Sequence, residues 1–224
     1  MTLRTPKGRI QRNAHVPEHK EVLQALIVLM DTNPLVWRRL EVPIDFSFWD
    51  LHVAIQDAMG WKDYHLHEFR CPQFARAGTR TIGIPDDDGF EKPAAPGWSI
   101  PIDLYAGIYK SMPFEYVYDF GDGWRHLVSF EDRYRAEDGV MYPRCVAGAR
   151  KCPPEDCGGP HGYLGFLEAI RDKKHPEHKE YLEWVGGKFN PDDFKPESIK
   201  FDDPDMRYRV AFEGEEYEGA LRLK

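Results

Sequence analysis

Three of the four cysteines of this chain lie close together in segment 142–160, which is rich in proline and glycine. Cys145, Cys152 and Cys157 are separated from one another by six and by four residues. Proline and glycine adopt special backbone angles, so we expect this loop to hold its thiols stiffly. Clustered thiolates are typical ligands of zinc. The spacing therefore predicts a zinc site, with free thiols in a proline- and glycine-held loop as the alternative.

A structural zinc ion usually takes four nitrogen or sulfur ligands, so the three cysteines need a fourth, and His126 is the first choice. Segments 114–120 and 124–130 are rich in aromatic residues and flank an Asp-Gly pair, a pattern typical of a β-hairpin. A two-residue turn at Asp122 and Gly123 would place Asp119 opposite His126. The carboxylate of Asp119 could then accept a hydrogen bond from the second ring nitrogen of this ligand.

Two more histidines belong to a predicted strand. Segment 64–71 alternates in character, which places His65 and His67 on one face together with Phe69 and Cys71. Neighbouring imidazoles can bind a metal or line a pocket, although a packed or hydrogen-bonded pair is the simpler interpretation. His161 is another possible donor.

Four acidic residues of the same segments are candidates for cation binding or for acid–base catalysis. They are Asp119, Asp122, Glu155 and Asp156. A structural role is the alternative for each, because aspartate suits turns and carboxylates accept N–H bonds from loops and helix starts.

Trp124 and Arg38 complete the candidates. Trp124 is expected in the core or as a platform for a partner, and Arg38 in a salt bridge or at a phosphate. The candidate binding residues are thus His65, His67, Asp119, Asp122, Trp124 and Arg38, and the candidate metal ligands are His126, Cys145, Cys152 and Cys157.

Local patterns predict the elements that position these residues. The apolar run 25–30 and the alternating segment 36–42 flank a turn and predict a hairpin. Ser47 and Asp50 form a capping-box pattern, and apolar residues then recur at helical spacing until Gly60. Beyond the cysteines, two helices are expected, one containing Tyr163 to Ile170 and one from Pro176 to the glycines at 186–187.

The order of these elements predicts an α+β fold, a mostly antiparallel sheet with packed helices, in a single domain with a C-terminal helical portion. We expect a loosely ordered lead-in at 1–20, the α+β domain at 21–200 and an acidic C-terminal segment at 201–224. Residues 76–100 are expected to be loop-like.

Composition narrows the classes of function. The 224 residues carry a formal net charge of −8, which disfavours sequence-independent binding to nucleic acid without excluding it. No run of 18 apolar residues and no apolar leader are present, so we expect a cytoplasmic protein without membrane contact. In that reducing setting, clustered cysteines are more often thiols or metal ligands than disulfides.

Four motifs carry a resemblance to a known family. They are the segments 34–43, 59–69, 116–126 and 142–163, which read PLVWRRLEVP, MGWKDYHLHEF, YVYDFGDGWRH and YPRCVAGARKCPPEDCGGPHGY. In this order and spacing, the chain resembles the plasmid-pRi "ORF-three-like" family, also described as transposon passenger TnpR-like proteins. The resemblance implies an α+β protein of a group often encoded on plasmids or near mobile elements.

The sequence contains no P-loop, dinucleotide-binding glycine fingerprint, zinc-protease motif or serine-hydrolase motif. We therefore expect a non-enzymatic interaction or adaptor module with an unknown protein partner and a zinc-stabilised cysteine loop. The alternatives are a metal-dependent enzyme acting on nucleic acid through His65, His67, Asp119 and His126, and a DNA-binding accessory of transposition.

Overall fold

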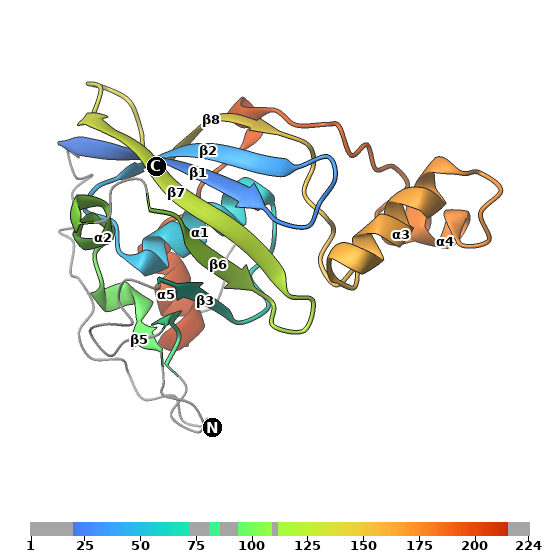
Figure 1. Ribbon diagram of the computed structural model, residues 1–224, viewed down its shortest axis with the longest axis horizontal. Coiled ribbons are helices and arrows are strands. Elements are labelled where there is room, and N and C mark those ends of the chain that lie inside the picture. Colours follow the sequence, from blue (N-terminus) through green and yellow to red (C-terminus); the bar gives the residue numbers. More distant parts are fainter. Residues whose placement is uncertain (1–19, 72–80, 86–93, 109–111, 215–224) are drawn as a thin grey trace.

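The computed structural model describes residues 20–71, 81–85, 94–108 and 112–214 (Figure 1). An eight-stranded sheet forms its centre, with the strand order β5-β4-β3-β6-β7-β1-β2-β8. All neighbouring strands are antiparallel except β4 and β5. The strands are β1 Glu21–Leu29, β2 Val36–Pro43, β3 His67–Arg70, β4 Ile82–Gly83, β5 Ala95–Pro96, β6 Phe114–Tyr118, β7 Trp124–Arg135 and β8 Arg144–Ala149. The predicted α+β class with a mostly antiparallel sheet is confirmed.

The first hairpin forms as its alternating pattern predicts. Ala25 of β1 lies opposite Leu40 of β2, and the long strand β7 pairs with the other edge of β1. Both Ala25 and Leu40 are fully buried. The apolar residues of these strands thus form one wall of the core.

Helix α1, Phe48–Met59, begins and ends where the local sequence predicts. The Ser47 hydroxyl accepts a hydrogen bond from the Asp50 N–H, and the Asp50 carboxylate accepts one from the Ser47 N–H at 2.6 Å. Gly60 ends the helix at a φ of +85°, a left-handed conformation that glycine adopts at little cost. Buried residues line almost the whole helix, because a sheet lies on one side of it and a further helix on another.

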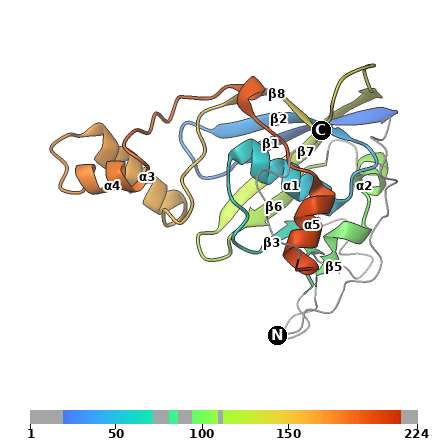
Figure 2. The ribbon, with the colours of Figure 1, turned by 180° about the vertical axis from the view of Figure 1, so that it is seen from behind.

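That further helix, α5, spans Pro204–Phe212 in the acidic C-terminal segment. It lies on the same side of the sheet as α1 (Figures 1 and 2). The indole N–H of Trp49 donates to the Pro204 carbonyl at 2.9 Å, and the buried Tyr208 packs edge-on against Trp49. This part of the C-terminal segment therefore completes the core.

The hairpin of β6 and β7 forms, but the register predicted for it is wrong. Tyr116, not Asp119, lies opposite His126, and the strands end at Tyr118 and Trp124. Asp119 adopts a φ of +55°, and its carbonyl accepts the Gly123 N–H at 2.6 Å. This wider connection between the strands replaces the predicted two-residue turn. Asp119 consequently belongs to the loop and cannot orient His126.

The C-terminal helical portion is confirmed. Helices α3, Gly159–Arg171, and α4, His178–Trp184, lie together at one end of the sheet (Figure 1). Phe166 of α3 is fully buried and contacts the rings of Tyr181, Trp184 and Phe189. These aromatic contacts join the helical portion to the same hydrophobic core as the sheet.

The remaining elements are short. Within the segment predicted as a loop, the described residues form β4, β5 and a helical turn, Gly97–Ser99, whose Trp98 is buried. Helix α2 spans Ile102–Ile108, and a second helical turn spans Pro196–Ser198. None of the helices in the described part of the chain has the length and apolar character needed to cross a bilayer. The predicted lead-in lies outside the described residues except for Lys20.

Candidate functional site

Three loops bring a histidine and two aspartates together at the surface. The Nε2 atom of His65 lies 2.9 Å from Oδ1 of Asp156 and 3.6 Å from Oδ2 of Asp119. His65 precedes β3, Asp119 follows β6 and Asp156 lies between Cys152 and Cys157 in the loop after β8. The side chain of Asp156 is 64% exposed and that of His65 is 31% exposed, so solvent reaches the group. We call His65, Asp119 and Asp156 the surface cluster.

Backbone hydrogen bonds orient Asp119, which lies in the loop between β6 and β7. Oδ1 of Asp119 accepts the N–H groups of Gly121 at 2.9 Å and Asp122 at 3.2 Å, while its Oδ2 faces His65. The Asp119 N–H donates to the Leu66 carbonyl at 3.0 Å, which joins the loop before β3 to the hairpin loop. One carboxylate thus stabilises a turn and contributes to the cluster.

Glu155 fastens the cysteine loop to the rest of the site. Its carboxylate accepts the Lys62 N–H at 2.6 Å and the Tyr118 hydroxyl at 3.2 Å. Burial raises the pKa of Glu155, and these two donors act in the opposite direction. The Trp61 indole also donates to the Pro153 carbonyl at 3.0 Å. These contacts hold the neighbouring Asp156 beside His65.

Asp122 and Gly159 make a second connection between the hairpin loop and the cysteine loop. Oδ2 of Asp122 accepts the Gly158 N–H at 3.2 Å. A Cβ atom at Gly159 would lie 2.3 Å from the Asp122 carbonyl oxygen, so only glycine permits this approach. The predicted role of Asp122 in loop structure is consistent with this contact.

Large exposed apolar side chains are next to the surface cluster in the sequence. Tyr64 is 67% exposed, Leu66 is 52% exposed and Phe120 is 53% exposed. Each is a direct sequence neighbour of His65 or Asp119. We call these three residues together with the surface cluster the acidic–apolar face.

His67 turns away from this face and into the core. Its ring lies 3.4 Å from the ring of His52 on α1, with the two planes 8° apart. Asp63, on the loop after α1, completes this group, and its Oδ1 lies 3.0 Å from Nε2 of His52. We call His52, Asp63 and His67 the buried cluster. Sequence reasoning missed His52, although a histidine and Gln56 at a spacing of four inside an apolar helix were a signal of buried polar contacts.

The predicted metal ligands lie in several places. In the described ranges, the only groups of three or more histidine, cysteine or acidic side chains whose ligand atoms all lie within 4.8 Å of one another are the surface and buried clusters. Neither group contains a cysteine or His126. His126 is fully buried on β7, its Nδ1–H donates to the Tyr116 carbonyl at 3.3 Å, and burial lowers its pKa to about 4.

Cys145, Cys152 and Cys157 are free thiols, and the first two lie near the buried Arg38. Burial raises the pKa of Cys145 and, to well above its usual range, that of Cys152, while the Arg38 guanidinium acts in the opposite direction on both. Burial also raises the pKa of Cys157 to about 12. Zinc binding by these residues and His126 stays a prediction.

Arg38 and Trp124 are both part of the core. Arg38 is 2% exposed and donates to the carbonyls of Ala58, Trp37 and Ala149, which ties α1 to β2 and β8. Trp124 is fully buried and packs against Trp61. The surroundings of Trp124 agree with a place in the core, whereas Arg38 bonds to backbone carbonyls in place of the predicted salt bridge.

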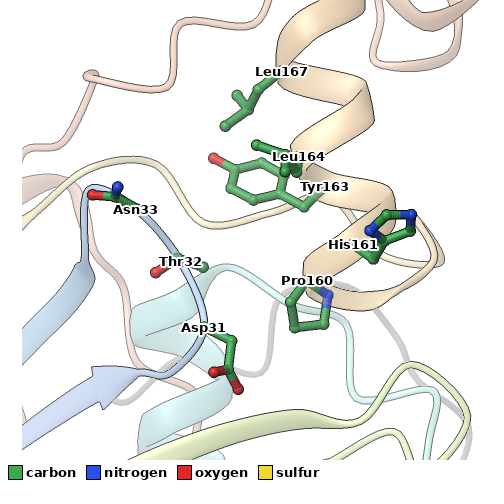
Figure 3. A pocket seen from close by; sticks show the side chains of 8 residues that line it. All are labelled: Asp31, Thr32, Asn33, Pro160, His161, Tyr163, Leu164 and Leu167. Carbon is green, nitrogen blue, oxygen red and sulfur yellow. The ribbon is translucent and has the colours of Figure 1, made fainter.

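A pocket of about 250 Å³ lies between the turn that follows β1 and helix α3 (Figure 3). Asp31, Thr32 and Asn33 line one side, and His161, Tyr163 and Leu164 are among the residues on the other. His161, a further predicted donor, therefore lies at this pocket and in neither cluster. The pocket and the acidic–apolar face are separate features.

Comparisons with known proteins agree with the fold and with one another. The family model described as "Plasmid pRiA4b ORF-3-like protein" matches residues 21–198. The uncharacterized protein y4hQ of Sinorhizobium fredii is 36% identical over 167 residues, which cover 74% of this chain and 81% of the relative. A crystal structure of a protein of unknown function, MM3350 from Methanosarcina mazei Go1, is 36% identical, with a TM-score of 0.72 over 81% of this chain and 99% of the other. These descriptions do not mention transposition, so the transposon association stays a prediction.

Proposed function

This chain belongs to the plasmid pRiA4b ORF-3-like family, and we propose that it is a non-enzymatic interaction module that binds a protein partner through the acidic–apolar face. The convergence of His65, Asp119 and Asp156, with exposed apolar side chains at the adjacent positions of the chain, is the observation that carries this proposal. Protein-binding sites combine exposed apolar and aromatic side chains with a few oriented polar groups.

Four residues are candidates for catalysis: His65, His67, Asp119 and His126. Their positions favour an interaction module over an enzyme. His67 and His126 are 3% and 0% exposed, whereas His65 and Asp119 lie at the surface cluster. A catalytic site needs its groups to converge on a solvent-reachable cleft. The four residues do not converge in this way.

Charge indicates the chemistry of the partner. Asp119, Asp122, Glu155 and Asp156 lie within the two connected loops, and His65 and Lys62 are the basic residues next to them. An excess of carboxylates attracts cations and increases the rate of encounter with a basic surface. Tyr64 and Phe120 present aromatic faces that can stack on arginine or lysine. The partner segment therefore carries a lysine or arginine beside an apolar side chain.

Binding of synthetic peptides to the full chain tests this proposal. Peptides that contain arginine next to leucine are compared with peptides in which glutamate replaces arginine. We expect the basic peptides to bind, and Phe120→Ser or Asp156→Asn to weaken binding about tenfold, which corresponds to ~1.4 kcal/mol. Leu104→Ser is the matched control, because Leu104 is similarly exposed, at 51%, but lies on α2.

Equal binding of both peptide classes, or an equal loss in the Leu104 variant, would contradict the proposal. Absence of binding in every peptide tested, measured by fluorescence anisotropy at low salt, would contradict it as well. Because surface charge pairs are screened by salt, binding of the basic peptides is expected to weaken as ionic strength increases.

A metal-dependent enzyme acting on nucleic acid is the second candidate. One observation favours it: the surface cluster brings together one imidazole and two carboxylates, of which His65 and Asp156 are reached by solvent and Asp119 is buried. Such ligands bind divalent cations, which can activate water for phosphodiester hydrolysis. Mn²⁺-dependent cleavage of a single-stranded oligonucleotide that disappears in Asp119→Asn would favour this candidate over the interaction module.

A zinc-stabilised cysteine loop is the remaining part of the proposal. Cys145, Cys152 and Cys157 would supply thiolates, and the loop would then hold Glu155 and Asp156 in the acidic–apolar face. Metal analysis of untagged protein, together with a thiol count before and after chelation, tests this. About one zinc per chain with thiols that react only after chelation supports the loop site, whereas four reactive thiols and no zinc contradict it.

A further inference from the structure

The buried cluster places three metal-ligating side chains at one point of the core. His52 comes from α1, Asp63 from the following loop and His67 from β3. One ligand atom from each lies within 4.8 Å of those of the other two. Ligands of one transition-metal ion lie at about 2.0–2.2 Å from it, and hence about 3–4 Å from one another. The spacing is therefore within reach of a single ion.

One nitrogen atom of this cluster has no hydrogen-bond partner among the described residues. It is Nδ1 of His67, a residue that is 3% exposed. Nε2 of the fully buried His52 has Oδ1 of Asp63 as its partner at 3.0 Å. Buried polar atoms of folded proteins normally have a partner, so an unpartnered imidazole nitrogen in this cluster indicates a missing ligand.

The surrounding contacts resemble the outer contacts of metal sites. Nδ1 of His52 lies 2.9 Å from the Tyr116 hydroxyl, which also accepts the Gln56 amide at 2.8 Å. Oδ2 of Asp63 accepts the Arg207 guanidinium at 2.9 Å. Ligating histidines and carboxylates are commonly oriented by hydrogen bonds to their remaining atoms.

Charge in this region also favours a cation. Arg207 lies 2.9 Å from Asp63, 2.8 Å from Asp202 and 3.6 Å from Asp57. Three carboxylates thus share one guanidinium. A divalent ion at the buried cluster would offset the excess negative charge.

We propose that His52, Asp63 and His67 bind one divalent transition-metal ion. Two imidazoles and one carboxylate suit zinc, iron(II) or cobalt(II) better than magnesium or calcium, which prefer oxygen ligands. This site is distinct from the acidic–apolar face and from the cysteine loop, so it goes beyond the proposed function. The site lies between α1, β3 and the residues that hold α5. A bound ion would join these elements and would therefore have a structural role.

The stacking of the His52 and His67 rings determines which side-chain movement metal binding requires. A histidine nitrogen binds a metal along its lone pair, which lies in the plane of the ring. Two stacked rings with planes 8° apart cannot both direct a lone pair at one ion. Binding therefore turns at least one ring out of the stack, and this movement is a measurable signature.

Titration of the metal-free full chain with Co²⁺, followed by visible absorption, and with Zn²⁺, followed by calorimetry, tests the site. Cys152→Ser protein, which lacks one ligand of the proposed cysteine site, is used for the titration, and in it we expect one equivalent to bind. Asp63→Asn, which preserves side-chain size, is expected to weaken this binding about 100-fold. Asp156→Asn of the surface cluster, made in the same Cys152→Ser protein, is the matched control and is expected to leave this binding unchanged.

A second measurement keeps the test independent of the stability of the Asp63 variant. Side-chain ¹⁵N signals of His52 and His67 in Cys152→Ser protein are expected to shift on addition of Zn²⁺, while those of His126 and His161 stay in place. Absence of binding in Cys152→Ser protein, binding without these shifts, or loss of binding in Asp156→Asn would overturn the site. Peptide binding at the acidic–apolar face is measured separately, so failure of one proposal is distinguishable from failure of the other.

Discussion

Asp119 contributes to both structure and charge at the candidate site. Its Oδ1 accepts two backbone N–H groups, while its Oδ2 faces His65. Its φ of +55° is a conformation that aspartate and asparagine tolerate better than most residues. The two contributions can be separated by substitution, because an amide keeps the acceptor and removes the charge.

Asp119→Asn is expected to fold with nearly wild-type stability and to bind basic peptides less tightly. Asp119→Ala removes both hydrogen bonds from the loop and places a residue of low tolerance at positive φ, so we expect it to lower the free energy of unfolding by about 2 kcal/mol. Urea unfolding of the two variants checks this. Equal stability of the two would show that the carboxylate does not stabilise the loop.

His126 should influence how stability depends on pH. Burial lowers its pKa in the folded chain to about 4, against 6.5 for an unperturbed histidine. Below pH 6.5 the unfolded chain takes up a proton that the folded chain does not bind until about pH 4. The resulting loss of stability grows as the pH falls through this window and reaches at most about 3 kcal/mol.

We expect His126→Gln to lower the free energy of unfolding at pH 7. The additional decrease in this free energy between pH 6.5 and pH 4 should be smaller than in the wild type. Urea unfolding across this pH range measures both. His161→Gln, at an exposed histidine, is the control and should leave the pH profile unchanged. An unchanged acid-side slope in His126→Gln would show that other groups cause the acid sensitivity.

At the scale of elements, α5 shows how a polar segment can complete a core. Pro204 and Tyr208 are the buried residues of this helix. Tyr208 contacts the rings of Trp49, Trp98 and Phe212. A helix with so few apolar anchors has a weak periodic signal in its sequence.

Tyr208→Ala is expected to lower the free energy of unfolding by about 3–5 kcal/mol, the usual loss for a buried aromatic side chain. Ala211→Ser, at an exposed position of the same helix, should change it by less than about 1 kcal/mol. Urea unfolding followed by tryptophan fluorescence checks both. A small effect of Tyr208→Ala would mean that α5 adds little to the stability of the domain.

At the scale of the whole molecule, the sheet, the helical portion and the loops enclose the cysteines to different degrees. Cys71 is 1% exposed and Cys152 is 6% exposed, whereas Cys145 and Cys157 are partly exposed. Burial raises the pKa of Cys71 to about 12, so its thiolate is scarce at pH 8. Burial raises the pKa of the partly exposed Cys157 to about 12 as well, so access, not ionisation, distinguishes the deeper thiols from Cys157.

In chelator-treated, metal-free native protein at pH 8, we expect iodoacetamide to modify Cys145 and Cys157 before Cys71 and Cys152, with the latter pair reacting only as the fold opens. Mass spectrometry of peptides at successive times measures the order, and protein in urea, where all four thiols should react at similar rates, is the control. Native modification of Cys71 as fast as Cys157 would contradict the burial described here.

The sequence by itself determined what depends on near neighbours. The capping box at Ser47 and Asp50, the stop at Gly60, the first hairpin and the two helices after the cysteines follow from hydrogen bonds and apolar spacing within a few residues. Only the tertiary structure decided the register that places Tyr116 opposite His126, the burial of His67 beside His52, and the approach of Asp156 to His65. These outcomes join residues far apart along the chain, and packing of the whole core, not local propensity, determines which of them meet.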